Sequence, residues 1–144
     1  VIGMINGRLR RQEEFANSKA ILDIRLEPQV IDRRSAPVDV WHQQLMHLYE
    51  VATTHPRVSI QILRSKAVYG TGYLPQNPFT ILTYRRPSGL SLVDADSNDA
   101  GRLITDPVLV RRYETLFDQM TSEALAMDKA TSARLIYEAA ESCQ

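Results

Sequence analysis

Two carboxylic acids stand where acid and base chemistry would need them, in segments that alternate apolar and polar residues. Glu27 ends the run ILDIRLE, and Asp94 lies in the run LSLVDAD. If these two runs form neighbouring strands, the carboxylates share a cleft, where one can donate a proton while the other accepts one. The alternative interpretation is that both are solvated charges at the ends of strands.

The segment between two other strand-like runs is long and reads YGTGYLPQNPF, with Gly70 and Gly72 between Tyr69 and Tyr73. Two glycines are too few for a dinucleotide fingerprint, and a phosphate loop would end in Gly-Lys-Ser/Thr. Two interpretations remain open. The segment is a wide connector in which the glycines supply positive φ, or it is a lid whose tyrosines form the wall of a pocket.

The remaining reactive side chains do not form a set. His42 and His47 are five residues apart on a predicted helix, roughly 140° around its axis, so they cannot share a metal as residues four apart would. His55 lies near the end of that helix, and Cys143, the single cysteine, lies close to the end of the sequence. No serine stands in a G-x-S-x-G motif. The sequence therefore predicts no catalytic residues, no metal site and no cofactor.

Composition limits the class of protein. The 144 residues predict one domain, and the 17 basic and 17 acidic side chains exclude the strong basic field typical of nucleic-acid-binding domains. The absence of a long apolar run predicts no membrane span, and a single cysteine excludes a disulfide framework. We expect a cytoplasmic location. Because the sequence begins VIGMINGRLRR without an initiator methionine, we also expect a fragment of a longer protein.

Hydrophobic periodicity predicts the elements that position these residues. The predicted helices cover residues 2–16, 35–56, 107–124 and 129 onwards, and the predicted strands cover 21–27, 58–64, 79–85 and 90–96. Asp106, before Pro107, and Asp128 are the expected caps of the last two helices. This order predicts an α+β fold, with one small, mostly antiparallel sheet, helices packed on one of its faces and a C-terminal pair of helices.

The ordered set of segments is similar to that of a known family. Its pieces are RLRRQEE, ILDIRLEPQVIDRR, WHQQLMHLYEVATTHPRVSIQILRS, GTGYLPQNPFTILTY and DPVLVRRYETLFDQM. Together they resemble the C-terminal domain of actinobacterial Xre-type helix-turn-helix regulators, the WhiJ-like group. The resemblance implies a regulatory domain that follows a DNA-binding domain absent from these residues. It also implies a small partner protein or a small-molecule effector, in a genetic arrangement likened to antitoxin and toxin.

The family's motifs carry over position by position. Arg112, Glu114 and Phe117 match the last motif, and Asp94 stands where the family usually has glutamate. We assign ligand or partner binding to positions that match the family motifs and to the two loop tyrosines. The residues are Glu27, Gln44, Tyr69, Gly70, Gly72, Tyr73, Asp94 and Tyr113.

Three hypotheses compete. The first is an effector- or partner-binding regulatory domain over residues 1–144, with no DNA-binding residue of its own. The second is a stand-alone enzyme that uses Glu27, Asp94 and a loop tyrosine for acid and base chemistry. The third is a module that forms homodimers.

Overall fold

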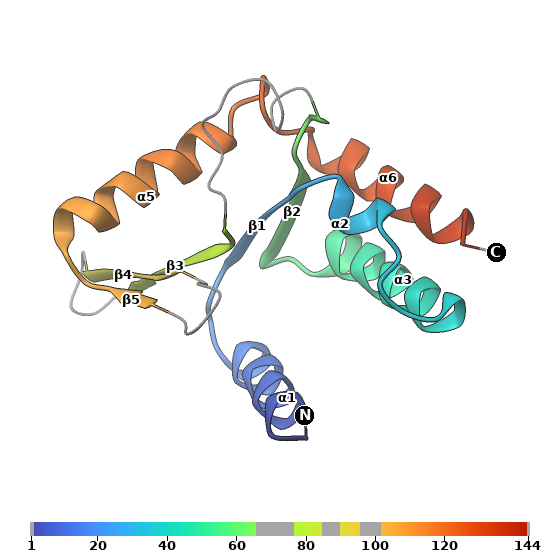
Figure 1. Cartoon of the computed structure of the whole chain (residues 1–144), viewed down its shortest axis with the longest axis horizontal. Helices are drawn as coiled ribbons and strands as arrows, with labels where there is room; N and C mark the ends of the chain where they lie inside the picture. Colours follow the sequence, from blue (N-terminus) through green and yellow to red (C-terminus); the bar gives the residue numbers. More distant parts are fainter. Residues whose placement is uncertain (1, 66–76, 85–89, 96–101, 144) are drawn as a thin grey trace.

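The computed structural model has the α+β fold that the sequence predicts, and it describes residues 2–65, 77–84, 90–95 and 102–143 (Figure 1). The elements run in the order α1 (Ile2–Asn17), β1 (Leu22–Leu26), α2 (Gln29–Asp32), α3 (Val38–Thr54), β2 (Val58–Ile62), β3 (Phe79–Tyr84), β4 (Leu90–Ala95), β5 (Arg102–Ile104), α5 (Pro107–Met120) and α6 (Lys129–Glu141). Within the described ranges no helix is both long and apolar enough to cross a bilayer.

The strands form two sheets, where we expected one. β1 and β2 pair in parallel, with Leu22 opposite Val58 and Leu26 opposite Ile62. β3, β4 and β5 form a separate antiparallel sheet in that order. The parallel pair follows from the connection between its strands, because α3 carries the chain back across the sheet as a crossover helix does.

The first core lies between the parallel pair and the helices α3 and α6, on the right of Figure 1. Its buried members are Ile31, Leu45, Val58, Ile60, Ile62, Ile136 and Ala140. Ser132 is fully buried beside them, and its Oγ accepts a hydrogen bond from the Ile62 N–H at 2.9 Å. His42 joins the two helices, because its Nδ1 lies 2.9 Å from the Ala140 carbonyl oxygen and donates to it. The helices predicted at residues 35–56 and from 129 onwards are thus confirmed as α3 and α6.

The second core lies where α5 packs on the antiparallel sheet and contains Val93, Ile104 and Val110. Asp106 caps α5 as expected, with its side chain accepting from Val108 N and Leu109 N. In this part of the chain the prediction misses the end of α5 and one strand. The helix ends at Met120, so Ala124 lies beyond it and is exposed, and residues 102–104 form a strand that the sequence did not predict.

A third, small cluster connects the two cores. Leu63, Met120 and Ala126 are buried together, with Phe79 and Phe117 packed against them. An isolated antiparallel bridge joins Leu63 to Ala126. The end of β2, the end of α5 and the start of β3 therefore meet at this point.

Helix α1 projects from the rest of the molecule (Figure 1). Its last turn is held by Arg57, whose guanidinium donates to the carbonyl oxygens of Ser18, Ala20 and Ala16. The same guanidinium lies 5.1 Å from the centre of the Phe15 ring. Leu9 is 52% exposed. The helical periodicity of the sequence therefore predicts this helix correctly, although Leu9 is not buried.

Candidate functional site

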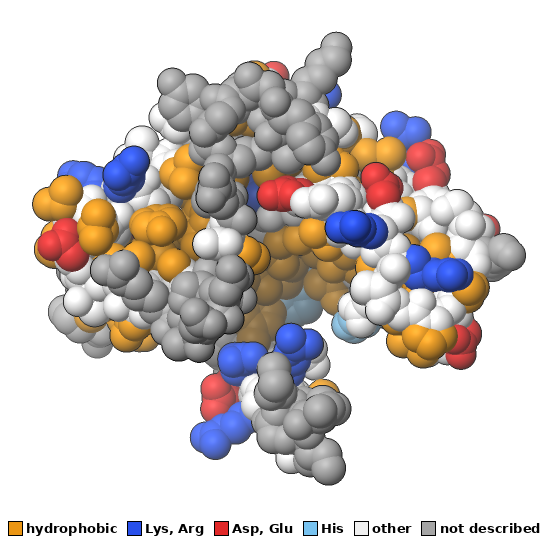
Figure 2. Space-filling view, viewed as in Figure 1, with side chains coloured by type: hydrophobic (Ala, Val, Ile, Leu, Met, Phe, Trp, Pro, Cys, Tyr) orange, Lys and Arg blue, Asp and Glu red, His pale blue; other side chains and the backbone are white. Residues whose placement is uncertain are grey.

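A cleft of about 820 Å³ lies between β1 and the two elements β3 and α5. One wall comes from residues 21–27 of β1 and its ends, and the opposite wall comes from residues 77–81 and Thr83. The face of α5 that carries Glu114, Phe117 and Asp118 completes it. Figure 2 shows hydrophobic side chains in the hollow at the middle of this view and over the neighbouring part that carries α5. The cleft therefore lies between the two cores.

The cleft combines apolar walls with a few charged groups. The apolar side chains that line it include Ile24, Leu26, Leu63, Phe79, Ile81, Phe117 and Met120. The ionisable ones are Asp23, Arg25, Glu27, Glu114 and Asp118. A concave apolar surface with a small number of polar groups is typical of ligand-binding sites.

Arg25 is the most buried of these charged side chains, with 3% of the side chain exposed. Its Nη1 contacts Asp23 Oδ1 at 3.2 Å and the Ile24 carbonyl oxygen at 3.1 Å, and its Nη2 donates to Thr121 Oγ1 at 3.2 Å. The guanidinium lies 5.1 Å from the centre of the Phe117 ring. Its Nε is buried and has no hydrogen-bond partner among the described residues. Arg25 thus ties β1 to the end of α5 and keeps one donor free.

The carboxylates lie on both sides of Arg25. Glu27, just after β1, accepts a hydrogen bond from Gln29 Nε2. Glu114 and Asp118 are four residues apart, one turn of α5, so they share the face that also carries Phe117. Four carboxylates against one guanidinium give the described lining of the cleft a negative charge.

The structure separates the predicted site residues. Glu27 lines the cleft, whereas Asp94 is exposed on β4, opposite Thr80 and Leu103 in the antiparallel sheet, and is absent from the lining. The expectation of neighbouring strands is wrong, because Glu27 follows a strand of the parallel pair and the two acids belong to different sheets. The arrangement of one shared acid and base pair, on which the enzyme hypothesis depended, is not formed by the cleft lining.

The other candidates lie elsewhere. Gln44 is exposed on α3, away from the cleft lining. Tyr113 packs its ring against Phe79, with ring centres 5.0 Å apart, and belongs to the second core. Tyr69, Gly70, Gly72 and Tyr73 lie outside the described residues. Asn77 and Pro78, which follow that loop in the sequence, line the cleft.

The sequence reasoning missed several cleft residues. Arg25 is on the polar face of an alternating strand, a pattern that normally indicates solvent, and no sequence signal shows that α5 covers this face. Glu114 and Phe117 had a usable signal. Both match the last family motif, and with Asp118 they recur at the three- and four-residue spacing of one helix face.

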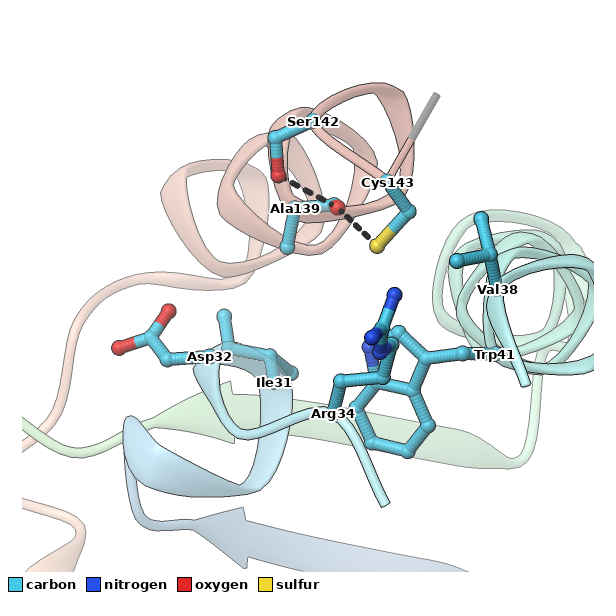
Figure 3. A pocket seen from close by; sticks show the side chains of 8 residues that line it. All are labelled: Ile31, Asp32, Arg34, Val38, Trp41, Ala139, Ser142 and Cys143. Carbon is cyan, nitrogen blue, oxygen red and sulfur yellow. Dashed lines mark hydrogen bonds between the residues drawn. The ribbon is translucent and has the colours of Figure 1, made fainter. Parts of the chain in front are cut away.

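A second cavity, of about 530 Å³, lies between α2, α3 and the end of α6. Figure 3 shows Trp41, Val38 and Cys143 around it, with Asp32 at the other end. Cys143 Sγ contacts the Ala139 carbonyl oxygen at 3.1 Å, and Ser142 Oγ donates to the same oxygen at 2.8 Å. These contacts satisfy a carbonyl in the last turn of a helix, so they account for both side chains structurally.

The part of the chain that the structure describes contains no group of three or more His, Cys, Asp or Glu side chains placed to hold a metal ion. The described carboxylate whose pKa is clearly displaced is Asp128, outside the cleft. Hydrogen bonds from the Thr131 backbone N–H and hydroxyl lower its pKa. The described lining of the cleft offers apolar contact, carboxylates and the Arg25 guanidinium.

Comparison with known proteins identifies the family to which this chain belongs. No curated protein and no solved structure matches the chain. A family model described as a domain of unknown function, DUF5753, matches residues 3–138, which include all the elements that form the cleft. The chain therefore belongs to the DUF5753 family.

Proposed function

We propose that this domain is a non-catalytic binding module, and that it is the effector- or partner-binding half of a helix-turn-helix regulator of the Xre type. The observation that carries the proposal is the cleft of about 820 Å³ between β1, β3 and α5. The family motifs noted in the sequence support the regulatory context, in which such a protein acts in the cytoplasm. The DNA would be contacted by a separate domain.

The position of the cleft supports a regulatory role. Its walls come from two packed units, the parallel pair with α3 and α6 and the antiparallel sheet with α5. A ligand that contacts both walls stabilises the arrangement in which they are correctly spaced. Ligand binding would thereby shift the population of conformations that an attached domain experiences.

Native mass spectrometry of the protein isolated from its own host tests the proposal, followed by the same measurement under denaturing conditions. We expect a second mass, from a small molecule or a polypeptide, that is lost on denaturation. Thr83 lines the cleft and is exposed, so Thr83→Trp should fill the space and reduce the bound fraction at least about tenfold.

Leu82→Trp is the matched control, because Leu82 is the adjacent residue of β3, is 42% exposed and does not line the cleft. It should retain the second mass. Equal loss in both variants, or a bare chain mass in the wild-type protein, would contradict binding in the cleft. A bare mass that doubles at higher concentration would favour the homodimer instead.

A further inference from the structure

The outer edge of β1 carries backbone groups that have no backbone partner among the described residues. Leu22 N donates to the Arg57 carbonyl oxygen at 2.8 Å, and the Leu26 carbonyl oxygen accepts from Leu63 N at 2.8 Å, so Leu22, Ile24 and Leu26 direct their backbone groups towards β2. The N–H and C=O groups of Asp23 and Arg25 consequently point the other way. Among the described residues they have no backbone partner, and β2 is the single strand that pairs with β1.

The far edge of β2 is hydrogen-bonded at its C-terminal end, in contrast. The Ile62 N–H donates to Ser132 Oγ at 2.9 Å, and the Ile62 carbonyl oxygen accepts from Met127 N at 2.9 Å. The bridge from Leu63 to Ala126 covers the end of the strand. The end of β2 is thus bonded to Met127 and to Ser132 of α6, while the described residues leave the edge of β1 as a template for a further strand.

The open edge borders the cleft, and so does β3, which pairs with β4 on one side. β1 has five residues, a length of roughly 17 Å at the usual rise per residue of a strand. An extended segment laid along it would place alternate side chains towards Phe79, Ile81 and Phe117. The cleft therefore offers backbone pairing along one wall and apolar contact on the other.

Charge and an unpaired donor restrict what this segment can be. Asp23, Glu27, Glu114 and Asp118 make the lining acidic, and the Arg25 guanidinium already contacts Asp23 at 3.2 Å. An incoming segment with basic side chains is favoured, and acidic side chains are repelled. The buried Arg25 Nε lacks an acceptor among the described residues, and a backbone carbonyl supplies one.

We propose that the cleft binds an extended segment of a partner protein, in which Lys or Arg alternates with apolar residues, and that this segment adds to the edge of β1 as a strand. The inference rests on the proposed function and specifies its partner. Main-chain hydrogen bonds to Asp23 and Arg25 provide affinity, and the acidic and apolar walls select the sequence.

The test uses the 144-residue chain and a synthetic library of ten-residue peptides that alternate Lys or Arg with Val, Ile, Leu or Phe. A library with Glu at the basic positions is the control. We expect binders from the basic library alone. In the best binder, N-methylation of the alternate backbone amides that face β1 should weaken binding roughly tenfold or more, because each methyl group removes a donor. Methylation of the amides that face away should have a smaller effect.

Amide hydrogen exchange distinguishes strand addition from other binding in the same cleft. Binding should protect the amides of Asp23 and Arg25, for which the described part of the chain supplies no backbone partner. The charge-reversal variant Glu27→Lys should weaken binding of the basic peptide and leave the circular dichroism spectrum unchanged, since Glu27 is outside the strand pairing.

The possible failures of the two proposals are distinguishable. Strand addition is overturned if no basic peptide binds, if methylation on the two sides has the same effect, or if the Asp23 and Arg25 amides stay unprotected. The binding module still stands in those cases if native mass spectrometry detects a ligand that Thr83→Trp removes. If neither method detects a ligand, both proposals are wrong.

Discussion

Arg25 is a buried charged side chain next to Phe117. Replacing it distinguishes the contribution of its packing to stability from the contribution of its charge. Arg25→Ala should lower the free energy of unfolding by about 2–4 kcal/mol, because it leaves a cavity beside Phe117 and removes the bonds to Thr121. Arg25→Met should stay within about 1 kcal/mol of the wild type, since an apolar chain of similar length often replaces a buried charge at little cost. Urea denaturation measures both values. Equal destabilisation by the two variants would show that the charge, not the volume, is what stabilises the fold.

Ser132 accepts the hydrogen bond of the Ile62 N–H, and its replacement measures what this buried bond contributes to stability. Ser132→Ala leaves the buried Ile62 N–H without its acceptor, and we expect a loss of about 1–3 kcal/mol in the free energy of unfolding. Ser142→Ala is the control, because Ser142 is exposed and donates to a helix-end carbonyl that Cys143 also contacts. An equally large loss of stability in Ser142→Ala would contradict the idea that the hydrogen bond of Ser132 matters because it is buried.

Residue by residue, local signals were reliable and long-range ones were not. Asp106 and Asp128 were predictable as caps because an N-cap is decided within three residues of sequence. Glu27 lines the cleft, whereas Asp94 belongs to the other sheet, since strand pairing decides which acids meet. Arg25 could not be predicted, because its burial depends on a helix that lies about ninety residues further along the chain.

At the scale of elements, the start of α6 depends on one carboxylate. Asp128 Oδ1 accepts from the Thr131 N–H at 2.8 Å, and Oδ2 accepts from the Thr131 hydroxyl at 2.7 Å. These bonds stabilise the ionised form and lower the pKa of Asp128 below its ordinary value of 3.8. Its contribution to stability is therefore fully present above that pH and is lost as the pH falls through the lower, folded-state pKa.

The variant Asp128→Ala follows from this dependence. At neutral pH it should unfold at a lower temperature than the wild type, because the cap is lost. The difference should narrow steadily as the pH falls below 3.8. Thermal melts followed by circular dichroism from pH 7 to pH 2 measure it, and a difference that stays constant over this range would argue against an ionised cap.

The boundaries that the sequence missed have physical reasons. The apolar spacing of α5 continues to Ala124, but Thr121 ends the helix and the chain turns so that Ala126 can pair with Leu63. β5 has three residues, too few to show an alternating pattern. Tertiary contacts therefore overrode helical spacing at one place and created a strand at the other.

For the molecule as a whole, Arg57 is the joint between α1 and the rest. Arg57→Lys should loosen α1, because a lysine cannot reach three carbonyl oxygens and lie over Phe15 together. We expect amide exchange in residues 10–17 to become roughly tenfold faster, with Ile60 and Ile62 unchanged. Hydrogen exchange with mass or NMR detection measures it.

Arg64→Lys provides the comparison, since Arg64 stands at the other end of β2 and donates to the Glu123 carbonyl oxygen at 3.0 Å. It should leave α1 unaffected. Faster exchange throughout the parallel pair in Arg57→Lys would mean that this arginine stabilises the entire fold and not α1 alone.

The fold class could be predicted from the sequence, and the division into two sheets could not. Periodicity identifies helices and strands one at a time, so the α+β class followed from their order. Which strands pair is settled by contacts such as that of β1 with β2, whose residues are thirty-six positions apart in the sequence. The cleft exists because the two sheets remain separate, and for this reason its lining was largely hidden from sequence reasoning.

The first core has a consequence for how the chain folds during its synthesis. Ile60 and Ile62 pack against Ile136 and Ala140. The early part of the chain therefore cannot complete this core until the last helix has been synthesised. Until α6 leaves the ribosome, the nascent β1–α3–β2 unit exposes its apolar face and the second edge of β2. The nascent unit is therefore prone to aggregation at that stage. A chaperone that binds exposed apolar strands would bind it before α6 is complete.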